Sequence, residues 1–262
     1  MIKFFRKIRQ KMLAENKFSK YLLYAVGEII LVVIGILIAL QINNNNNYNE
    51  RRSLEKEYLL SIQTEFKNNL NIINASIQEN EQRIESLEYL LNLFDKNVLD
   101  TVSSQRISQK FAPIFGSSIS YIPATGVLED IISSGKLNIL LNKKLRQNIA
   151  SFNSSLNYLD IQLNAMDFTE ENLRTIFYKK GSTRKLVMDI GFMDFDFKSI
   201  SEKIDNKQLF ESAEFENYLL AYYLSAKVTN GPKLFGRVKT EIETIIKEIE
   251  QELENKDSAP KN

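Results

Sequence analysis

The feature that most constrains this chain is an apolar run near its N-terminus, Tyr21–Ile42, in which only Glu28 and Gln41 are strongly polar. As a helix, these 22 residues would extend roughly 33 Å, enough to cross a hydrocarbon core of about 30 Å. A cleaved signal peptide has a shorter apolar region and ends at a small-x-small site. A buried soluble helix fits less well, because residues 29–40 are apolar on every face. The run therefore predicts a single transmembrane helix, residues 21–42.

The charges on the two sides of this run predict its orientation. Residues 1–20 carry seven Lys or Arg side chains and one Glu, a net charge of +6, whereas few cations follow the run directly. Excess Lys and Arg stays on the cytoplasmic side of a membrane. We therefore expect a single-pass protein of the bacterial inner membrane, with its N-terminus in the cytoplasm and its C-terminal domain in the periplasm.

The same residues, 1–20, form a basic arm in which apolar side chains recur at helical spacing. Such a segment is typical of an amphipathic helix that lies on the inner leaflet, with its cations near anionic lipid. The alternative is a plain topology signal with no specific lipid partner. The candidate membrane-surface residues are Lys3, Arg6, Lys7, Arg9 and Lys11.

Glu28 is the unusual residue of the run, because it lies roughly 10 Å inside the predicted span. Its spacing from Gly35 and Ala39 is close to whole helical turns, so the three share one stripe. Gly35 and Ala39 form a small-xxx-small pair that lets another helix approach, and ionisable groups in a span usually face protein or water. The stripe is a candidate helix contact. Alternatively, Glu28 extends toward the cytoplasmic headgroups and pairs with Lys20 or Tyr24.

Beyond the span, the sequence predicts a linker and one helical domain. The asparagine run Asn43–Asn47 is polar and of low complexity, so residues 43–52 are interpreted as a solvated linker. Apolar residues from Leu54 to Phe94 recur about every 3.6 residues, which indicates an amphipathic helix of about 60 Å. The predicted fold class is mainly α: one transmembrane helix followed by an extracytoplasmic helical bundle, residues 53–256, and a disordered tail, residues 257–262.

Turn-forming residues divide the middle of this domain. Pro113 and neighbouring Gly, Pro and Ser residues predict irregular structure over residues 97–124. A short helix is expected next, with Thr125 as its N-cap and Gly135 at its end.

Three further helices and one strand are expected after it. A helix begins near Asn142, with a break around Asp167–Glu171, and others begin near Ser212 and after Gly231. Phe and Asp alternate within residues 186–200, which favours a strand or hairpin there.

The composition argues against the common enzyme classes. The chain has no Cys, which excludes disulfides, thiol catalysis and thiolate metal sites, and no His, the most frequent general base. Ser133 and Lys136 have the spacing of a Ser-x-x-Lys nucleophile, but the motifs that accompany it are missing, and a helix end explains the intervening Gly135 more simply. We expect no catalytic residue and no enzyme activity.

Binding of metals, cofactors or nucleic acid is not indicated either. Asp189, Asp194 and Asp196 could offer oxygen ligands to a hard cation, but they lack the spacing of a calcium loop. The only strong basic cluster lies beside the predicted span, which disfavours nucleic acid as a partner. No cofactor-binding or metal-binding residue is predicted.

Two stretches resemble a known family: the first 44 residues, from "MIKFFRKIRQKML" to "IALQINN", and "LEDIISSGKLNILLNKKLRQNI". Both are similar to an uncharacterised, domain-of-unknown-function family of single-span membrane proteins of flavobacterial type, as are the closing Tyr-rich and Glu-rich helices. That family commonly continues Ile-Asn-Asn-Trp-Asn-Glu, whereas here extra asparagines intervene and Tyr48 stands in place of Trp. The resemblance implies an inner-membrane protein with a periplasmic domain. It supplies no activity, substrate or catalytic residue.

Together these observations predict a membrane-anchored periplasmic helical bundle that acts through protein–protein contact, as a scaffold or interaction module. Its partners would be the lipid bilayer and a membrane or periplasmic protein, or a second copy of the chain. The alternative is a small-ligand sensor that signals through a separate membrane partner, since the cytoplasmic arm is too short for a catalytic domain. An exposed apolar face would favour the interaction module, and a polar pocket between helices would favour the sensor.

Overall fold

The structure is a computed structural model that describes residues 18–258, except the side chains of residues 18–21, 24, 202 and 256–258. Five cations of the basic arm (Lys3, Arg6, Lys7, Arg9 and Lys11) and residues 259–262 of the predicted tail lie outside this range. The described residues contain helices and no strand, so the mainly α prediction is confirmed. The chain divides into two compact units, residues 1–57 and 58–262.

The first unit contains the N-terminal part of helix α2 (Phe18–Leu91), which includes the apolar run. By its length and composition, this helix is able to cross a membrane. No residue in the most apolar stretch of the helix is buried against the rest of the described chain. Asn43–Asn47, where the sequence predicts a solvated linker, is helical. Asparagine in a helix costs only about 0.7 kcal/mol per residue relative to alanine, so helix on both sides can carry a short run of it.

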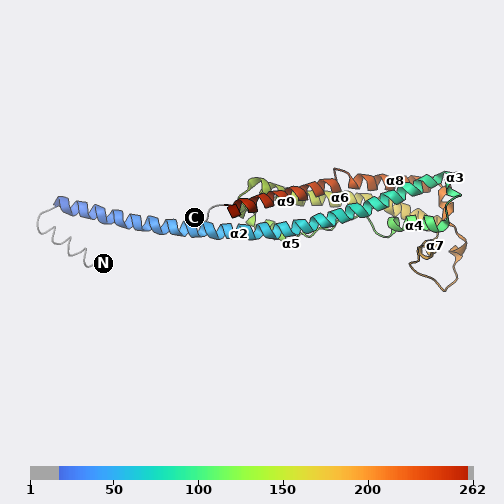
Figure 1. Ribbon diagram of the computed structural model, residues 1–262, viewed down its shortest axis with the longest axis horizontal. Helices are drawn as coiled ribbons and strands as arrows, with labels where there is room; N and C mark the ends of the chain where they lie inside the picture. The colour runs from blue at the N-terminus through green and yellow to red at the C-terminus, as the bar shows by residue number, and fades with distance from the viewer. Residues whose placement is uncertain (1–17, 259–262) are drawn as a thin grey trace. The chain divides into compact units, whose positions relative to one another are not determined.

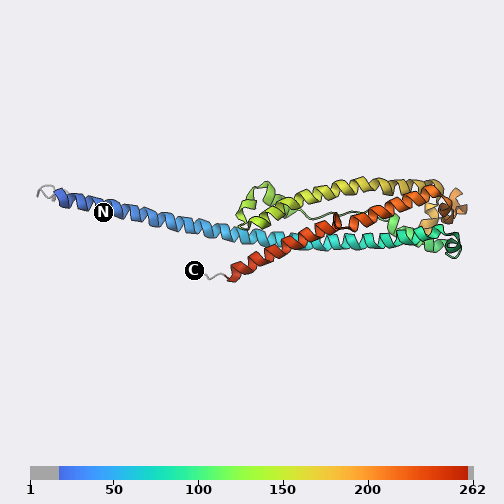
Figure 2. The same ribbon diagram turned by 90° about the horizontal axis from the view of Figure 1, so that it is seen from above.

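In the second unit, the later part of α2 and α6 (Lys143–Lys180) run alongside α8 (Ala213–Asn230) and α9 (Phe235–Ser258), which follow one another end to end along the bundle (Figures 1 and 2). The predicted stripe of α2 faces the core, where Ile62, Phe66 and Ile73 are fully buried. The Phe66 ring packs 4.9 Å, centroid to centroid, from Phe152 of α6. Burial of these stripes on one another forms a helical bundle.

The helix predicted after Thr125 is α5 (Gly126–Ser133), followed by the 3-10 helix η2 (Lys136–Ile139). Gly135 ends it as expected, with φ at +68°, a conformation that glycine adopts without steric cost. Thr125 is the N-cap residue, as predicted, but its side chain does not cap the helix, because the hydroxyl donates to Glu129 (2.7 Å). Glu65 of α2 caps α5, accepting from two backbone N–H groups.

Short helices gather at the end of the bundle where α2 finishes (Figure 1). They are η1 (Asn92–Phe94), α3 (Lys96–Leu99), α4 (Ser104–Phe115), α7 (Thr183–Asp189), η3 (Ile200–Lys203) and η4 (Asn206–Glu211). The irregular structure predicted over residues 97–124 is partly wrong, because helix α4 lies within this range. Pro113 is in its last turn, and Ile107 and Phe111 on its apolar face are buried.

The strand or hairpin predicted within residues 186–200 is also wrong. This stretch is the end of α7 followed by a loop, in which Gly191 has φ of +70°. The alternating Phe and Asp residues have no neighbouring strand among the described residues. Instead, the Arg184 guanidinium lies over the rings of Phe195 and Phe197 and donates to the Phe195 carbonyl. Local cation–π contacts therefore organise the loop.

Helix α6 shows no break around Asp167–Glu171 and continues to Lys180. The helix begins beside Asn142, as predicted, and the Asn142 side chain caps it by accepting from the backbone N–H groups of Lys144 and Leu145. The charged residues that suggested a break include Glu170, which is buried and hydrogen-bonded to α8 and to the segment after α4. Tertiary contacts thus use the polar residues without interrupting the helix.

Candidate functional site

The predicted helix-contact residues lie on α2 in the first unit. Glu28 is half-buried, whereas Gly35 and Ala39 are exposed. A Cβ atom added to Gly35 would meet no atom of the described residues within 4 Å. The helix contact of Glu28, Gly35 and Ala39 stays a prediction.

The Ser-x-x-Lys residues take up helix-end roles. The Ser133 hydroxyl points to the backbone of its own helix, 3.5 Å from the Asp130 carbonyl oxygen. The Lys136 ammonium donates to the Tyr58 hydroxyl (2.8 Å), which donates in turn to the Asp130 carboxylate (3.0 Å). The lysine therefore ties η2 to α2 in the second unit.

The three aspartates considered for a hard cation do not form a cluster. The Asp189 carboxylate accepts from Ser108 (2.7 Å) and pairs with Lys185 (3.2 Å), whereas Asp194 and Asp196 are exposed in the loop. Within residues 18–258, no group of three or more acidic side chains is placed to hold a metal ion.

Sequence reasoning missed a buried polar network inside the bundle. The predicted apolar stripe of α2 skips one turn, and there Asn80 is fully buried and donates to Ala226 O and Asn230 Oδ1 of α8, each at 2.8 Å. One turn later, Arg83 is 2% exposed and donates to Ser117 O at 2.6 Å. These bonds connect α2 to α8 and to the segment after α4.

Glu170 of α6 is the second centre of this network. Its carboxylate accepts from Tyr222 of α8 (3.1 Å), from Ser118 (3.2 Å) and from Arg174 one turn along (2.5 Å). Burial raises the pKa of the Tyr222 hydroxyl well above its ordinary value, so it stays protonated and donates. A cavity of about 10 Å³ beside Glu170 and Tyr222 has room for a single water.

Additional polar contacts fix the antiparallel register of α6 and α8. The Thr169 hydroxyl lies 3.3 Å from that of Ser225, and Thr229 donates to the sulfur of Met166 (3.2 Å). Hydrogen bonds are directional, so a one-turn slip of either helix would leave several buried groups unpaired. The two helices consequently present their outward faces in a defined arrangement.

Those outward faces carry large apolar side chains. On α6 they lie at 158, 161 and 168, with exposed Ala165 completing a 3-4-3 spacing, and on α8 they recur every fourth residue. We call this set the α6/α8 surface: Tyr158 (44% exposed), Ile161 (62%), Phe168 (68%), Leu220 (42%), Leu224 (54%) and Val228 (54%). The Thr169–Ser225 contact places the C-terminal end of the α6 stripe, at Phe168, beside the α8 stripe. It is the candidate functional site.

Helix α2 borders α8 on the other side of this surface through an ion pair. The Glu88 carboxylate accepts from the Tyr223 hydroxyl (2.7 Å) and pairs with the Lys227 ammonium (3.1 Å). The hydrogen bond from Tyr223, followed by that from Lys227, lowers the pKa of Glu88 below its ordinary 4.5. A charged rim beside exposed apolar side chains is common at protein interfaces.

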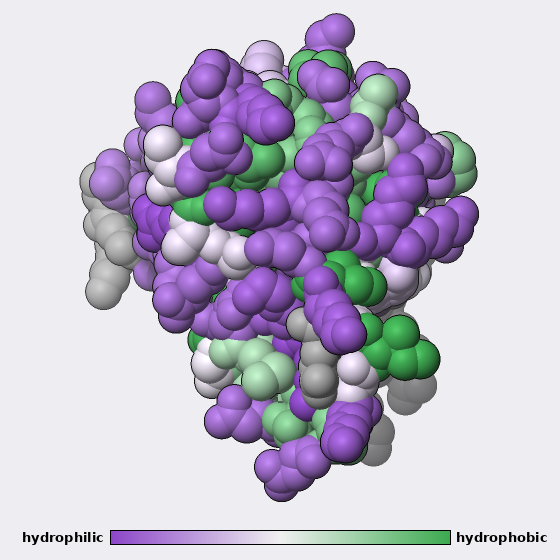
Figure 3. All heavy atoms as spheres, turned by 90° about the vertical axis from the view of Figure 1, so that its right-hand side faces the viewer, coloured by the Kyte–Doolittle hydropathy of each residue, from purple (hydrophilic) through white to green (hydrophobic). Residues whose placement is uncertain are grey.

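A second group of exposed apolar residues lies in the loop after α7, where Phe192, Met193, Phe197 and Ile200 are mostly exposed. Figure 3 faces this end of the bundle and shows small hydrophobic groups separated by hydrophilic side chains. Phe192, Met193 and Phe197 are on irregular backbone, whereas the α6/α8 surface is on two packed helices, which makes the latter the better-ordered binding face.

Comparison with family models gives one match, over residues 28–226, to a family of unknown function (DUF6090). The match covers more than half of the chain. The chain belongs to this family. The matched range starts within the apolar run and includes all of α6 and most of α8, whereas α9 lies beyond it. Searches of curated proteins and of solved structures gave no match.

Proposed function

We propose that the protein is a membrane-anchored interaction module in which the α6/α8 surface binds another protein chain. One observation carries the proposal: six large apolar side chains are 42–68% exposed on two helices whose register is fixed by buried hydrogen bonds. Soluble monomers seldom gather such side chains on one face, and a larger apolar patch with a polar rim is a usual mark of an interaction site. Preorganised helices also lose little entropy on binding.

The proposed location is the inner membrane of a bacterium. The apolar run would be the single anchor, with residues 1–20 in the cytoplasm and the helical bundle in the periplasm. The charge asymmetry around the run and the resemblance to flavobacterial single-span proteins support this assignment. We assign no enzymatic activity, because the chain lacks His and Cys and its Ser-x-x-Lys residues occupy helix-end contacts.

The spacing on α6 indicates the kind of partner. Residues 158, 161, 165 and 168 follow the 3-4-3 pattern of a coiled-coil seam, which pairs with the apolar stripe of another helix. The partner is therefore proposed to be a helical membrane or periplasmic protein, or a second copy of this chain.

Photo-crosslinking in native membranes tests this function. A benzophenone amino acid placed at Leu224 or Phe168 is expected to give one discrete adduct, and mass spectrometry would identify it as a second copy or another protein. The matched control is Ile200, which is 99% exposed but lies outside the surface. Substituting Phe168→Glu in the chain that carries the probe at Leu224 should abolish the adduct, whereas Ile200→Glu should not. Equal crosslinking at all three positions would contradict the proposal.

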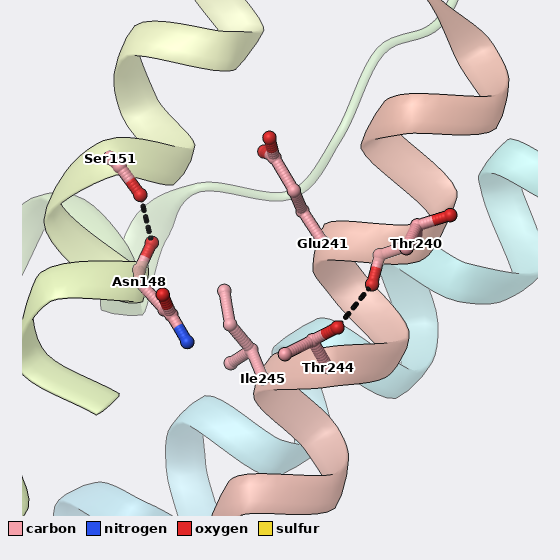
Figure 4. A pocket seen from close by; sticks show the side chains of 6 residues that line it. All are labelled: Asn148, Ser151, Thr240, Glu241, Thr244 and Ile245. Carbon is pink, nitrogen blue, oxygen red and sulfur yellow. Dashed lines mark hydrogen bonds between the residues drawn. The ribbon is translucent and has the colours of Figure 1, made fainter. Parts of the chain in front are cut away.

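A small-ligand sensor is the second candidate function. The observation that favours it is a pocket of about 150 Å³ between α6 and α9, lined mostly by polar residues (Figure 4). Polar groups that converge on a pocket between helices are a usual form of ligand site. The sensor would act through a separate membrane partner, and ligand-dependent crosslinking at Leu224 would distinguish it from a constitutive interaction module.

A further inference from the structure

Helix α6 is acidic along the part that carries its exposed apolar stripe. Residues 147–173 contain four acidic side chains and no Lys or Arg. One of the four, Glu170, is buried and belongs to the internal polar network. The other three are exposed, and we call them the acidic row: Asp160, Asp167 and Glu171.

The acidic row runs along one edge of the α6/α8 surface. Its members are seven and four residues apart, close to whole helical turns, so they lie on one line along α6. Successive residues of a helix are about 100° apart around its axis, which places Asp167 and Thr169 on opposite sides of Phe168. Thr169 contacts Ser225 of α8. The row therefore lies on the flank of the α6 stripe that faces away from α8.

The carboxylates of the row have no cationic partner within the part of the chain that the structure describes. None of them forms an ion pair there, and Asp160 accepts from the Asn164 amide (3.1 Å). Burial, followed by the charge of Glu170, raises the pKa of Asp167 above its ordinary 3.8, as expected where no cation offsets these effects. The row is thus a line of negative charge that the described residues leave unpaired.

Basic side chains at the ends of the α6/α8 surface are engaged elsewhere or lie beyond it. Lys179 is exposed about two helical turns past Glu171, beyond the end of the α6 stripe. Three others are paired with carboxylates outside the row: Arg174 with Glu170 (2.5 Å), Lys180 with Glu214 (3.3 Å) and Lys227 with Glu88 (3.1 Å). A bound partner is therefore the remaining source of positive charge for this edge.

We propose that the partner of the α6/α8 surface is a basic amphipathic helix of another protein, with Lys or Arg along one edge of its apolar stripe. This inference rests on the proposed interaction function and specifies its partner. A helix packed on the two exposed stripes would lay its basic edge against the acidic row, where complementary charges favour association and fix the register. An acidic helix would meet like charge along the same edge.

The acidic row also argues against a second copy of the chain on this surface. A two-fold dimer is isologous, so the same surface of both copies meets. With the stripes in register and the α6 helices antiparallel, the acidic row of one copy would face that of the other, which disfavours pairing. With the helices parallel, the row would face the α8 flank of the copy, where the Lys227 ammonium is already paired with Glu88.

Two synthetic helices test the charge preference on the full chain in nanodiscs of zwitterionic lipid, with empty nanodiscs as the baseline. Both carry Leu in the 3-4-3 spacing over about four heptads. One has Lys at the positions that flank the Leu stripe, and the other has Glu there. The Lys helix is expected to bind at least tenfold more tightly by fluorescence anisotropy, and about 0.5 M salt should remove most of this preference. Equal affinities, or no binding of the Lys helix, would overturn the proposal.

Two triple variants assign the preference to the acidic row. The row variant carries Asp160→Asn, Asp167→Asn and Glu171→Gln. The control variant neutralises three exposed carboxylates outside the surface, with Asp194→Asn, Asp196→Asn and Glu243→Gln. The row variant should bind the Lys helix about 3- to 30-fold more weakly, because exposed ion pairs are individually weak, whereas the control variant should bind as the wild type does. Wild-type affinity in the row variant, or equal loss in both variants, would refute the role of the row.

Crosslinking in native membranes separates a failure of this inference from a failure of the proposed function. With the probe at Leu224, an adduct that Phe168→Glu abolishes but the row variant leaves unchanged in yield would retain the interaction module and refute the basic partner. An adduct of two copies of this chain would refute it as well. If Phe168→Glu changes neither the adduct nor binding of the Lys helix, the α6/α8 surface is not the binding site and both proposals are wrong.

Discussion

Capping of α5 by a side chain of another helix gives a sharp test of the fold. Glu65, on α2, is 9% exposed, and its two oxygens accept from the backbone N–H groups of Val127 (2.7 Å) and Leu128 (3.0 Å). The first N–H groups of a helix have no partner within it, and a carboxylate there also interacts favourably with the helix dipole. Glu65 therefore takes the role that the sequence assigns to Thr125.

The expected cost of Glu65→Ala is about 2–3 kcal/mol of unfolding free energy. A lost N-cap alone costs about 0.5–2 kcal/mol, and here two donors in a mostly buried site lose a charged acceptor. Thr125→Ala should cost about 0.5 kcal/mol or less, because the Thr125 hydroxyl contacts only Glu129 at the surface. The two variants thus separate a cap supplied by α2 from a cap supplied by the local sequence.

Urea unfolding of the full chain in detergent, followed by circular dichroism at 222 nm, would measure both costs. Hydrogen exchange adds a local readout. Amides near Val127 and Leu128 should exchange faster than in the wild type in Glu65→Ala, and at the wild-type rate in Thr125→Ala. If Thr125→Ala proves the more destabilising, or if the α5 amides of Glu65→Ala exchange as in the wild type, the proposed cap is refuted.

Three other outcomes are expected. A reporter active only outside the cytoplasm should work when fused at Asn262 and a cytoplasmic reporter should not, because of the +6 arm; the reverse pattern would refute the proposed topology. Gly35→Leu should weaken association in membranes more than Leu37→Ala, since bulk on the stripe separates helix backbones; equal effects would mean that the stripe faces lipid. Glu88, whose pKa is lowered chiefly by the Tyr223 hydroxyl, contributes stability that is lost as pH falls below 4.5. Tyr223→Phe should move that loss to higher pH, which an NMR titration of the Glu88 carboxyl would follow.

The spacing of apolar residues predicted the long helices well, because a helix that buries one face needs an apolar residue at nearly every turn. In α2, residues of the predicted apolar stripe such as Ile62 and Phe66 are fully buried, and in α9 so are Ile242 and Ile249, which recur at helical spacing. The hydrophobic effect acts on a whole face of a helix, so the pattern persists even where single positions vary.

Contacts between distant segments account for most errors. The cap of α5 comes from a residue about sixty positions earlier, and no local pattern distinguishes Glu65 from a solvent-exposed glutamate. The turn skipped at Asn80 looked like a gap in an apolar stripe, and only the position of α8 shows it as a bonded polar centre. Likewise, Glu170 suggested a break in α6, whereas Tyr222 and Ser118 make it an internal acceptor.

The candidate site follows the same rule. In the sequence, the α6/α8 surface is only a set of apolar residues at helical spacing, and a buried apolar stripe has the same pattern. The fractional exposure of these side chains in the structure distinguishes the exposed stripe from a buried one.

Beneath its proposed binding face, the bundle holds hydrogen-bonded polar groups among its buried apolar side chains, and it exposes apolar side chains outside. Apolar contact alone would let α6 and α8 slide over each other with little loss, because dispersion and burial are non-directional. The bonds from Tyr222 to Glu170 and from Asn80 to α8 are directional, and a shift by one turn would leave buried polar atoms unpaired. Their proposed effect is specificity of arrangement. The exposed stripes are then held at a fixed spacing, which is what a partner helix needs in order to pack against both.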